Sequence, residues 1–265
     1  MNRHLLDTHA QNNAISQVNP ITKILLGIGT LILVLISQAP IIPTISTLTL
    51  SLTLIIIAKI PGKEYIRLLL IPAGFTLISV SAILLLSSGG EVFWEMHLAP
   101  WLTISITQNG VEKSMIILLR VIGGTVSLLF ISLTTPFTDI IRLLNQCHIP
   151  QEITDLMTIL YRNIFILLEQ ATQIHAAQIM RLGYSRPREA AESFGMLCGS
   201  LFISSWNAGD DLIRAMDSRY YDGKFPILTP SNPISARNMI PVITFLSFLI
   251  VLLILFSPNI LIEGI

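Results

Sequence analysis

Two arginines, Arg181 and Arg219, could recognise a partner, because each is followed within a few residues by an aromatic residue and a glycine. The first segment reads Arg181-Leu182-Gly183-Tyr184 and the second reads Arg219-Tyr220-Tyr221-Asp222-Gly223. A guanidinium presents several fixed donors to carboxylates or carbonyl oxygens, and it stays charged when it is desolvated. Two such groups could dock into two equivalent pockets of one partner. Alternatively, both are ordinary cations that complement the dipole at the C-terminal end of a helix.

Other side chains suited to catalysis or metal binding do not gather in the sequence. It contains no Gly-x-x-x-x-Gly-Lys-Ser/Thr loop that would cradle the phosphates of ATP, and no His-Glu-x-x-His pair. Cys147 and Cys198 lie 51 residues apart without paired histidines, and we expect both to be small buried residues. We therefore predict a chain that is not an enzyme and that holds no metal and no cofactor of its own.

Two helical patterns must position the arginines. Apolar residues recur at intervals of three and four after Pro150, and Gly183 is a suitable stop for a helix. This pattern predicts a helix of about 33 residues, or roughly 50 Å. A second pattern runs from about 188 to 219. Each arginine is therefore expected at the C-terminal end of a long helix.

The middle of the second pattern contains Gly195 and Gly199, four residues apart on one helical face. Such a pair either lets another helix approach closely or is merely tolerated. Gly223 and Pro226 follow the second arginine and favour the end of the helix.

The composition is that of a membrane protein. Hydrophobic residues make up 52% of the 265 residues, and the mean hydropathy is +0.71. Only 12% of the residues are charged, against about 25% in an ordinary soluble domain. A soluble fold of this size lacks the interior to hide so much apolar surface. A simple soluble enzyme, a disordered chain and a disulfide scaffold are excluded, and the formal net charge of zero gives no attraction to nucleic acid.

Long uncharged runs predict five membrane-spanning helices. A helix needs about 20 apolar residues to cross roughly 30 Å of hydrocarbon, and it satisfies its own backbone groups in lipid. We expect spans at about residues 22–38, 42–58, 66–87, 112–134 and 239–257. Arg120 falls within the fourth span, where a charge is either functional or a structural group that reaches the membrane surface.

The distribution of lysine and arginine orients these spans. Residues 1–23 and 59–67 carry five of these basic residues between them, whereas 88–111 carries none. By the positive-inside rule the N-terminus is cytoplasmic and the C-terminus lies outside. We predict an all-α integral membrane protein in three parts. These parts are a membrane module of four spans (1–134), a charged cytoplasmic module of long helices (135–238), and the fifth span with the outer C-terminus (239–265).

At its two arginine segments the chain resembles the T component of energy-coupling factor (ECF) transporters, in the CbiQ-like cobalt and nickel group. The resemblance covers nearly the whole chain. Its strongest segments are 177–184 and 215–223, and further matching residues are Asp7, Ala10, Asn13, Pro20, Lys23, Thr135-Pro136, Ile149-Pro150 and Tyr161-Arg162. The family carries two motifs of the Ala-Arg-Gly type. Here they read Met180-Arg181-Leu182 and Ser218-Arg219-Tyr220, so the arginines match and the small flanking residues do not.

The resemblance implies about five transmembrane helices and cytoplasmic coupling helices whose arginines sit in grooves of two ABC-type ATPase subunits. It implies that these partners bind ATP, and that a separate S component in the membrane binds a divalent metal ion. The site residues carried over are Arg181 and Arg219, flanked by Met180, Leu182, Ser218 and Tyr220.

The implied function is the coupling subunit of an ATP-driven importer in a prokaryotic cell membrane. The expected cargo is cobalt, with nickel left open, and the expected surroundings are the lipid bilayer and no nucleic acid. The alternative is a self-contained secondary transporter, to which only Pro72 and Gly123-Gly124 point as places where a helix could break.

Overall fold

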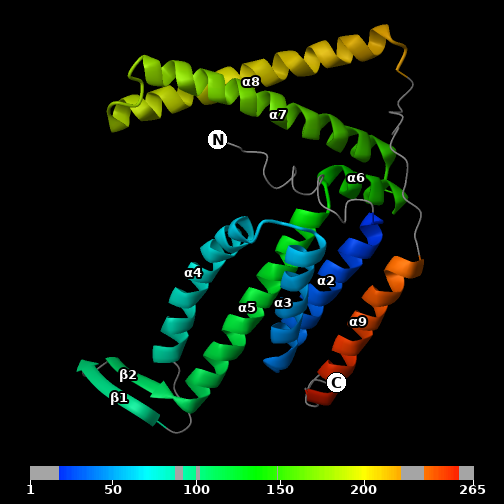
Figure 1. Ribbon diagram of the computed structural model, residues 1–265. Helices are drawn as coiled ribbons and strands as arrows, with labels where there is room; N and C mark the ends of the chain where they lie inside the picture. Colours follow the sequence, from blue (N-terminus) through cyan, green and yellow to red (C-terminus); the bar gives the residue numbers. More distant parts are fainter. Residues whose placement is uncertain (1–17, 87–91, 100–101, 148, 222–235, 257–265) are drawn as a thin grey trace. The chain divides into compact units, whose positions relative to one another are not determined.

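The computed structural model describes residues 18–86, 92–99, 102–147, 149–221 and 236–256 (Figure 1). The chain divides into two compact units, residues 1–140 with 230–265 and residues 141–229, and each is described by itself. The division into membrane and cytoplasmic parts after residues 134 and 238 stays a prediction. The predicted stop at Gly223 and Pro226 and the matching residues Asp7, Ala10 and Asn13 lie outside the described residues.

In the described part of the first unit there are five apolar helices, and each overlaps one predicted span. They are α2 (Pro20–Ile36), α3 (Ile41–Leu52) with its π-helical continuation η1 (Thr53–Ile57), α4 (Gly62–Leu86), α5 (Gln108–Thr134) and α9 (Ala236–Phe256). By length and composition α4, α5 and α9 can cross a membrane, whereas α2 and the α3–η1 segment are shorter apolar helices. The predicted all-α membrane fold is confirmed, with one short β-hairpin as its only departure among the described residues.

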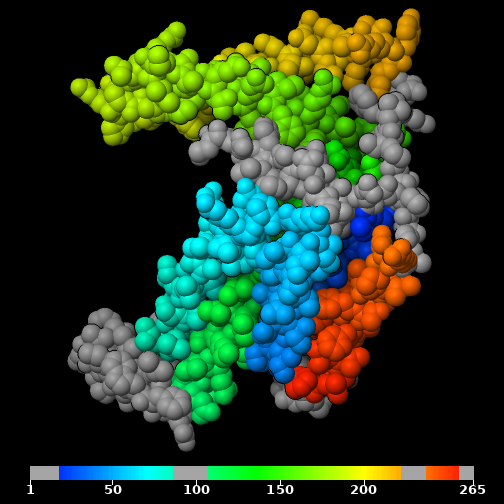
Figure 2. All heavy atoms as spheres, viewed as in Figure 1, coloured from blue at the N-terminus to red at the C-terminus, as the bar shows by residue number. Residues whose placement is uncertain are grey.

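Helix α5 lies between α4 on one side and α2 and α3 on the other, while α9 packs against α2 (Figure 1). Figure 2 shows α4, α3 and α9 exposed along one face of this unit. The core joins α3, η1 and α5 through buried apolar side chains that include Leu50, Leu54, Phe130 and Leu133. This packing leaves most of the apolar surface of α4 and α9 exposed, as expected for helices that face lipid.

Gly123 allows α2 and α3 to approach α5 closely. A Cβ atom at Gly123 would lie 3.2 Å from a methyl carbon of Val34 and 3.3 Å from the hydroxyl of Thr47. The α5 helix continues through Gly123-Gly124, and α4 continues through Pro72. These residues therefore do not break their helices.

Arg120 supplies a hydrogen-bond donor to the C-terminal end of the neighbouring helix α2. Its guanidinium donates a hydrogen bond of 2.5 Å to the backbone carbonyl of Ser37, the C-cap residue of α2. The last carbonyls of a helix have no partner within the helix, so a cation from α5 stabilises this end of α2. Of the two roles expected for Arg120, this contact supports the structural one.

The connection between α4 and α5 contains an antiparallel hairpin that the sequence analysis did not predict. Strand β1 (Val92–Ala99) pairs with β2 (Leu102–Thr107), and Glu95 lies opposite Ser105. The hairpin leads directly into α5, where the hydroxyl of Thr107 accepts a hydrogen bond of 3.2 Å from the N–H of Gly110.

Two long helices dominate the second unit. They are α7 (Gln151–Met180) and α8 (Pro187–Ser218), and both confirm the helices predicted from periodicity. The short helix α6 (Phe137–Gln146) precedes them and was not predicted. A Cβ atom at Gly195 or Gly199 would meet nothing within 4 Å, so no described helix approaches these glycines.

The expectation that both cysteines are buried is wrong, because Cys147 and Cys198 are exposed. For Cys198, which lies on α8, the physical reason is the thinness of the α7–α8 pair. Two paired helices can bury only the stripe along which they touch, so the remaining faces of each helix stay accessible.

Candidate functional site

The helices α7 and α8 form an antiparallel pair (Figure 1). Three side-chain contacts join them along their length, namely Gln178 to Ser193 at 2.8 Å, Ser204 to Gln170 at 2.8 Å and Tyr221 to Asp155 at 3.4 Å. Since the C-terminal part of one helix pairs with the N-terminal part of the other, Arg181 and Arg219 lie at opposite ends of the pair. The 32 residues of α8 separate them by about 48 Å.

We call residues 180–182 the first tip and residues 218–220 the second tip. At the first tip Arg181 is the C-cap residue of α7. The N–H of Leu182 donates to the carbonyl of Ile179 at 3.0 Å, and the N–H of Gly183 donates to the carbonyl of Gln178 at 2.9 Å. These two bonds define a Schellman cap, in which the residue after the C-cap adopts a left-handed backbone. Leu182 does so, with φ of 60°.

The second tip repeats this geometry. Arg219 is the C-cap residue of α8, and Tyr220 follows it with φ of 52°. The N–H of Tyr220 donates to the carbonyl of Asp217 at 3.2 Å, and the N–H of Tyr221 donates to the carbonyl of Met216 at 3.1 Å. The two arginines therefore occupy the same position in two copies of one helix cap.

Polar contacts with α8 brace the first tip. The side-chain amide of Gln178 donates to the carbonyl of Ser193 at 2.8 Å and accepts from the hydroxyl of Tyr184 at 2.9 Å. The hydroxyl of Ser193 donates to the carbonyl of Gly183 at 2.8 Å. A Cβ atom at Gly183 would lie 2.5 Å from that hydroxyl, so this glycine is required for close approach. Gly183 follows the end of α7 as predicted, but the left-handed residue is Leu182.

The second tip is braced by the start of α7. The hydroxyl of Tyr221 donates to a carboxylate oxygen of Asp155 at 3.4 Å, and Asp155 is buried. Each tip therefore rests on the first turns of the other helix. Sequence reasoning missed these bracing residues. Gln178, Tyr184 and Tyr221 lie inside the segments that carry the resemblance, whereas no local signal marked the role of Ser193 or Asp155.

The six site residues from the sequence analysis all lie at the surface, in two groups that the fold keeps apart. Met180, Leu182 and Tyr220 expose 86%, 74% and 95% of their surface. Arg181, Ser218 and Arg219 are also exposed.

The arginines of the tips differ from Arg186 and Arg188, the two arginines that follow the first tip. Arg186 lies 4.0 Å from a carboxylate oxygen of Glu189, and Arg188 lies 3.2 Å from one of Glu192. In the described part of the chain, neither Arg181 nor Arg219 forms an ion pair. Both tips can therefore offer a charged guanidinium to an external carboxylate or carbonyl.

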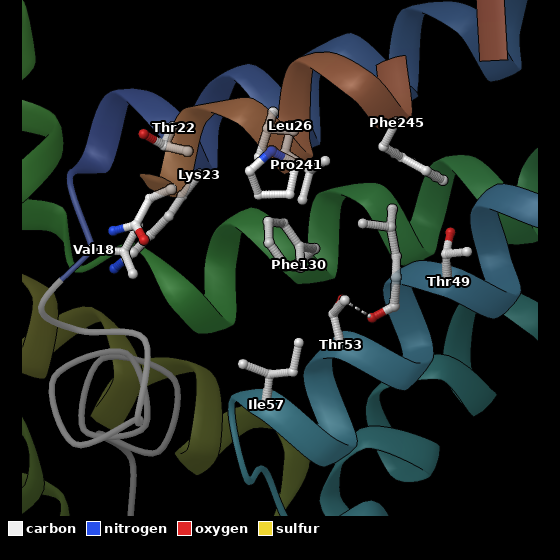
Figure 3. A pocket seen from close by; sticks show the side chains of 13 residues that line it. Val18, Thr22, Lys23, Leu26, Thr49, Thr53, Ile57, Phe130, Pro241 and Phe245 are labelled. Carbon is white, nitrogen blue, oxygen red and sulfur yellow. Dashed lines mark hydrogen bonds between the residues drawn. The ribbon is translucent and has the colours of Figure 1, made fainter. Parts of the chain in front are cut away.

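A separate pocket of about 550 Å³ lies in the first unit among α2, α3, η1, α5 and α9 (Figure 3). Its walls are largely apolar, with Phe130, Pro241 and Phe245 among them. Lys23 lines it, is buried, and donates from Nζ to the carbonyl of Thr134 at 3.0 Å. Such a lining suits hydrocarbon better than a metal ion. The bond brings Lys23 beside Thr135-Pro136, a second segment of the resemblance.

Metal ligands do not cluster among the residues that the structure describes. Within them, no group of three or more His, Cys, Asp or Glu side chains could hold a metal ion.

Comparison with known proteins decides the family. The model of the CbiQ family, described as cobalt transport protein, matches residues 11–230. The chain belongs to the CbiQ family. This confirms the resemblance to the T component of CbiQ-like ECF transporters, and with it a membrane component of a transporter.

Three relatives illustrate the range of similarity. A fused cobalt transport protein CbiMQ of Methanocorpusculum labreanum is 32% identical over 250 residues, which cover 94% of this chain and 42% of that longer protein. The cobalt transport protein CbiQ of Salmonella typhimurium is 28% identical over 222 residues, or 83% of this chain and 98% of the relative. The energy-coupling factor transporter transmembrane protein EcfT of Acidaminococcus fermentans is 28% identical over 225 residues, or 80% and 81% of the two chains.

Proposed function

We propose that this chain is the transmembrane coupling subunit of an ATP-driven ECF-type importer for divalent metal ions, with cobalt as the first candidate. Two ABC-type ATPase subunits bind ATP and receive the two tips, and a separate S component in the membrane binds the metal. The chain itself is not catalytic. The N-terminus, α7 and α8 face the cytoplasm, and the C-terminus lies outside.

One observation carries this proposal, namely that Arg181 and Arg219 occupy the same position in two matching caps about 48 Å apart. A single small pocket cannot receive both, whereas a partner with two separated and equivalent grooves can. Two ATPase subunits that pair around ATP are such a partner. The name cobalt transport protein, borne by relatives, supports the choice of metal.

The bracing of the tips suits a coupling role. Because each tip is hydrogen-bonded to the start of the other helix, a displacement at Arg181 or Arg219 is passed to both helices of the pair. Closure of the ATPase pair on ATP would shift α7 and α8 between two positions, and the membrane helices would follow. The S component then reorients and releases its metal inside.

The test is co-purification from membranes of the native host with the affinity-tagged full chain. The wild-type chain should carry ATPase chains and a metal-binding membrane chain, and membranes that contain it should take up cobalt when ATP is supplied. The double variant Arg181→Glu with Arg219→Glu should insert and fold but lose the ATPases and the uptake, since both residues are exposed.

The control is Arg188→Glu, which disrupts only an exposed pair with Glu192 and should behave as the wild type. Retention of the ATPases and normal uptake by the double variant would refute the proposal. A chain that transports alone, without co-purifying ATPases, would instead be a secondary transporter.

A further inference from the structure

The residue that follows each arginine adopts a backbone conformation that favours glycine. Leu182 has φ of 60° and Tyr220 has φ of 52°, and both occupy the left-handed position of the Schellman cap. A Cβ atom crowds the following carbonyl oxygen in this region, so glycine is the usual residue there. The chain instead places a large side chain at this position in both tips.

These side chains do not stabilise the helix ends that carry them. Leu182 is 74% exposed and Tyr220 is 95% exposed. The caps are closed by backbone hydrogen bonds that glycine would form equally well. In the described part of the chain, no hydrogen bond or ring contact involves the side chain of Tyr220. Stability of the isolated chain therefore favours glycine at both positions, and the observed residues need another reason.

We infer that Leu182 and Tyr220 are contact residues that insert into apolar pockets of the ATPase subunits, beside the grooves that receive Arg181 and Arg219. This inference rests on the proposed function. Each tip then has two adjacent parts, a guanidinium that meets carboxylates or carbonyls and an apolar side chain that excludes water around it. Removal of water strengthens the charged contact, and arginine and tyrosine are frequent at the energetic centres of interfaces.

The two tips differ in the pocket that they require. The first tip adds the exposed Met180 to Leu182 and is aliphatic, whereas the second combines the polar Ser218 with the aromatic ring of Tyr220. The receiving surface must therefore accept an aliphatic side chain at one end and a phenol ring at the other. The matched backbone sets where each side chain is presented, and the side chain sets which pocket it fits.

The experiment measures binding of the full-length variants in detergent to ATPase chains purified from the wild-type complex. In one double variant Leu182 and Tyr220 are both changed to glycine, and in the other both are changed to asparagine. Both replacements tolerate the left-handed backbone, and asparagine retains a polar side chain. We expect each double variant to bind at least tenfold more weakly, while its own midpoint of thermal unfolding stays equal to or above that of the wild type.

Two controls accompany these variants. Lys59 also has a left-handed backbone, with φ of 54°, but lies between η1 and α4, so Lys59→Gly should leave binding unchanged. The double variant Arg181→Glu with Arg219→Glu should abolish binding.

The outcomes separate the inference from the proposed function. Wild-type affinity of either the glycine or the asparagine double variant overturns the inference. The proposed function still stands in that case, provided that the arginine double variant fails to bind. Wild-type affinity of the arginine double variant refutes the proposed function itself.

Discussion

The side-chain amide of Gln178 and the backbone carbonyl of Ser193 are joined by a hydrogen bond of 2.8 Å, which ties the last turn of α7 to the start of α8. The same glutamine also receives the hydroxyl of Tyr184. Because the cap carbonyl of Gly183 is bonded to the hydroxyl of Ser193, the position of Arg181 depends on how α8 packs at this point. A change of packing here should therefore affect the first tip without touching the arginine.

Gly183→Ala should destabilise the first tip. The new methyl group would lie 2.5 Å from the hydroxyl of Ser193 and 3.1 Å from the carbonyl of Gln178, and such overpacking typically costs about 1–3 kcal/mol. We expect a lower midpoint of thermal unfolding in detergent and weaker retention of the ATPases. Gly199→Ala is the matched control, since its methyl group meets nothing within 4 Å and alanine favours a helix. Equal effects of the two changes would contradict the role assigned to Gly183.

Single reversal of an arginine should weaken assembly without abolishing it. Loss of one hydrogen-bonded interfacial charge costs about 2–5 kcal/mol, which is roughly thirty-fold to several-thousand-fold in affinity. Since the tips are about 48 Å apart, the remaining tip should still bind, and the effects of Arg181→Glu and Arg219→Glu on the free energy should add. Titration of each single variant with the ATPase chains checks this, and a single change as severe as the double one would show that the tips are not independent sites.

Lys23→Met should destabilise the membrane unit. The change removes a charged donor from the carbonyl of Thr134 at the end of α5, and a hydrogen bond to a charged group contributes about 1.5–3 kcal/mol. Thermal unfolding in detergent should show a lower midpoint. The exposed Lys63 offers the control Lys63→Met, which should leave the midpoint unchanged. A midpoint for Lys23→Met within error of the wild type would mean that this bond contributes little.

Cys198 reports the side of the membrane on which α8 lies. It is exposed, so in a Cys147→Ser background a membrane-impermeant maleimide should label it in inside-out vesicles but not in intact cells. A cysteine placed at position 95 of a cysteine-free chain should show the opposite pattern, because the 88–111 connection carries no lysine or arginine. Labelling of Cys198 in intact cells would reverse the proposed orientation.

The isolated chain should not hydrolyse ATP. Its sequence lacks a loop that cradles phosphates, so ATPase activity should appear only after the partner subunits are added. A phosphate-release assay on the purified chain, with and without those subunits, measures this. Turnover that follows the pure chain through successive purification steps would place the active site here.

Much of the architecture follows from the sequence alone. Hydropathy located the five apolar helices that the structure describes, because a nearly uncharged run of this length is a local property that lipid stabilises as a helix whatever its neighbours. Periodicity located α7 and α8, because the spacing of apolar residues along a helix is also a local property of the sequence. The resemblance singled out Arg181 and Arg219, and the structure places both at helix ends as predicted. The short α6 was missed although it is strongly amphipathic, because its 10 residues are fewer than the window over which helical periodicity is usually judged. The β1–β2 hairpin was missed because short apolar runs do not distinguish a strand from a helix.

Only the tertiary structure decided how these elements meet. Lys23 bonds to Thr134, 111 residues away, and Gln178 bonds to Ser193 on the facing helix. Local sequence does not encode such pairings, since they depend on which faces of two helices come into contact. The same holds for the caps. The sequence predicts Gly183 as the stop of α7, whereas the structure places Leu182 in the left-handed position and gives Gly183 a role in close approach to Ser193. A pattern read along one helix cannot distinguish these roles, because the second helix supplies the atoms that separate them.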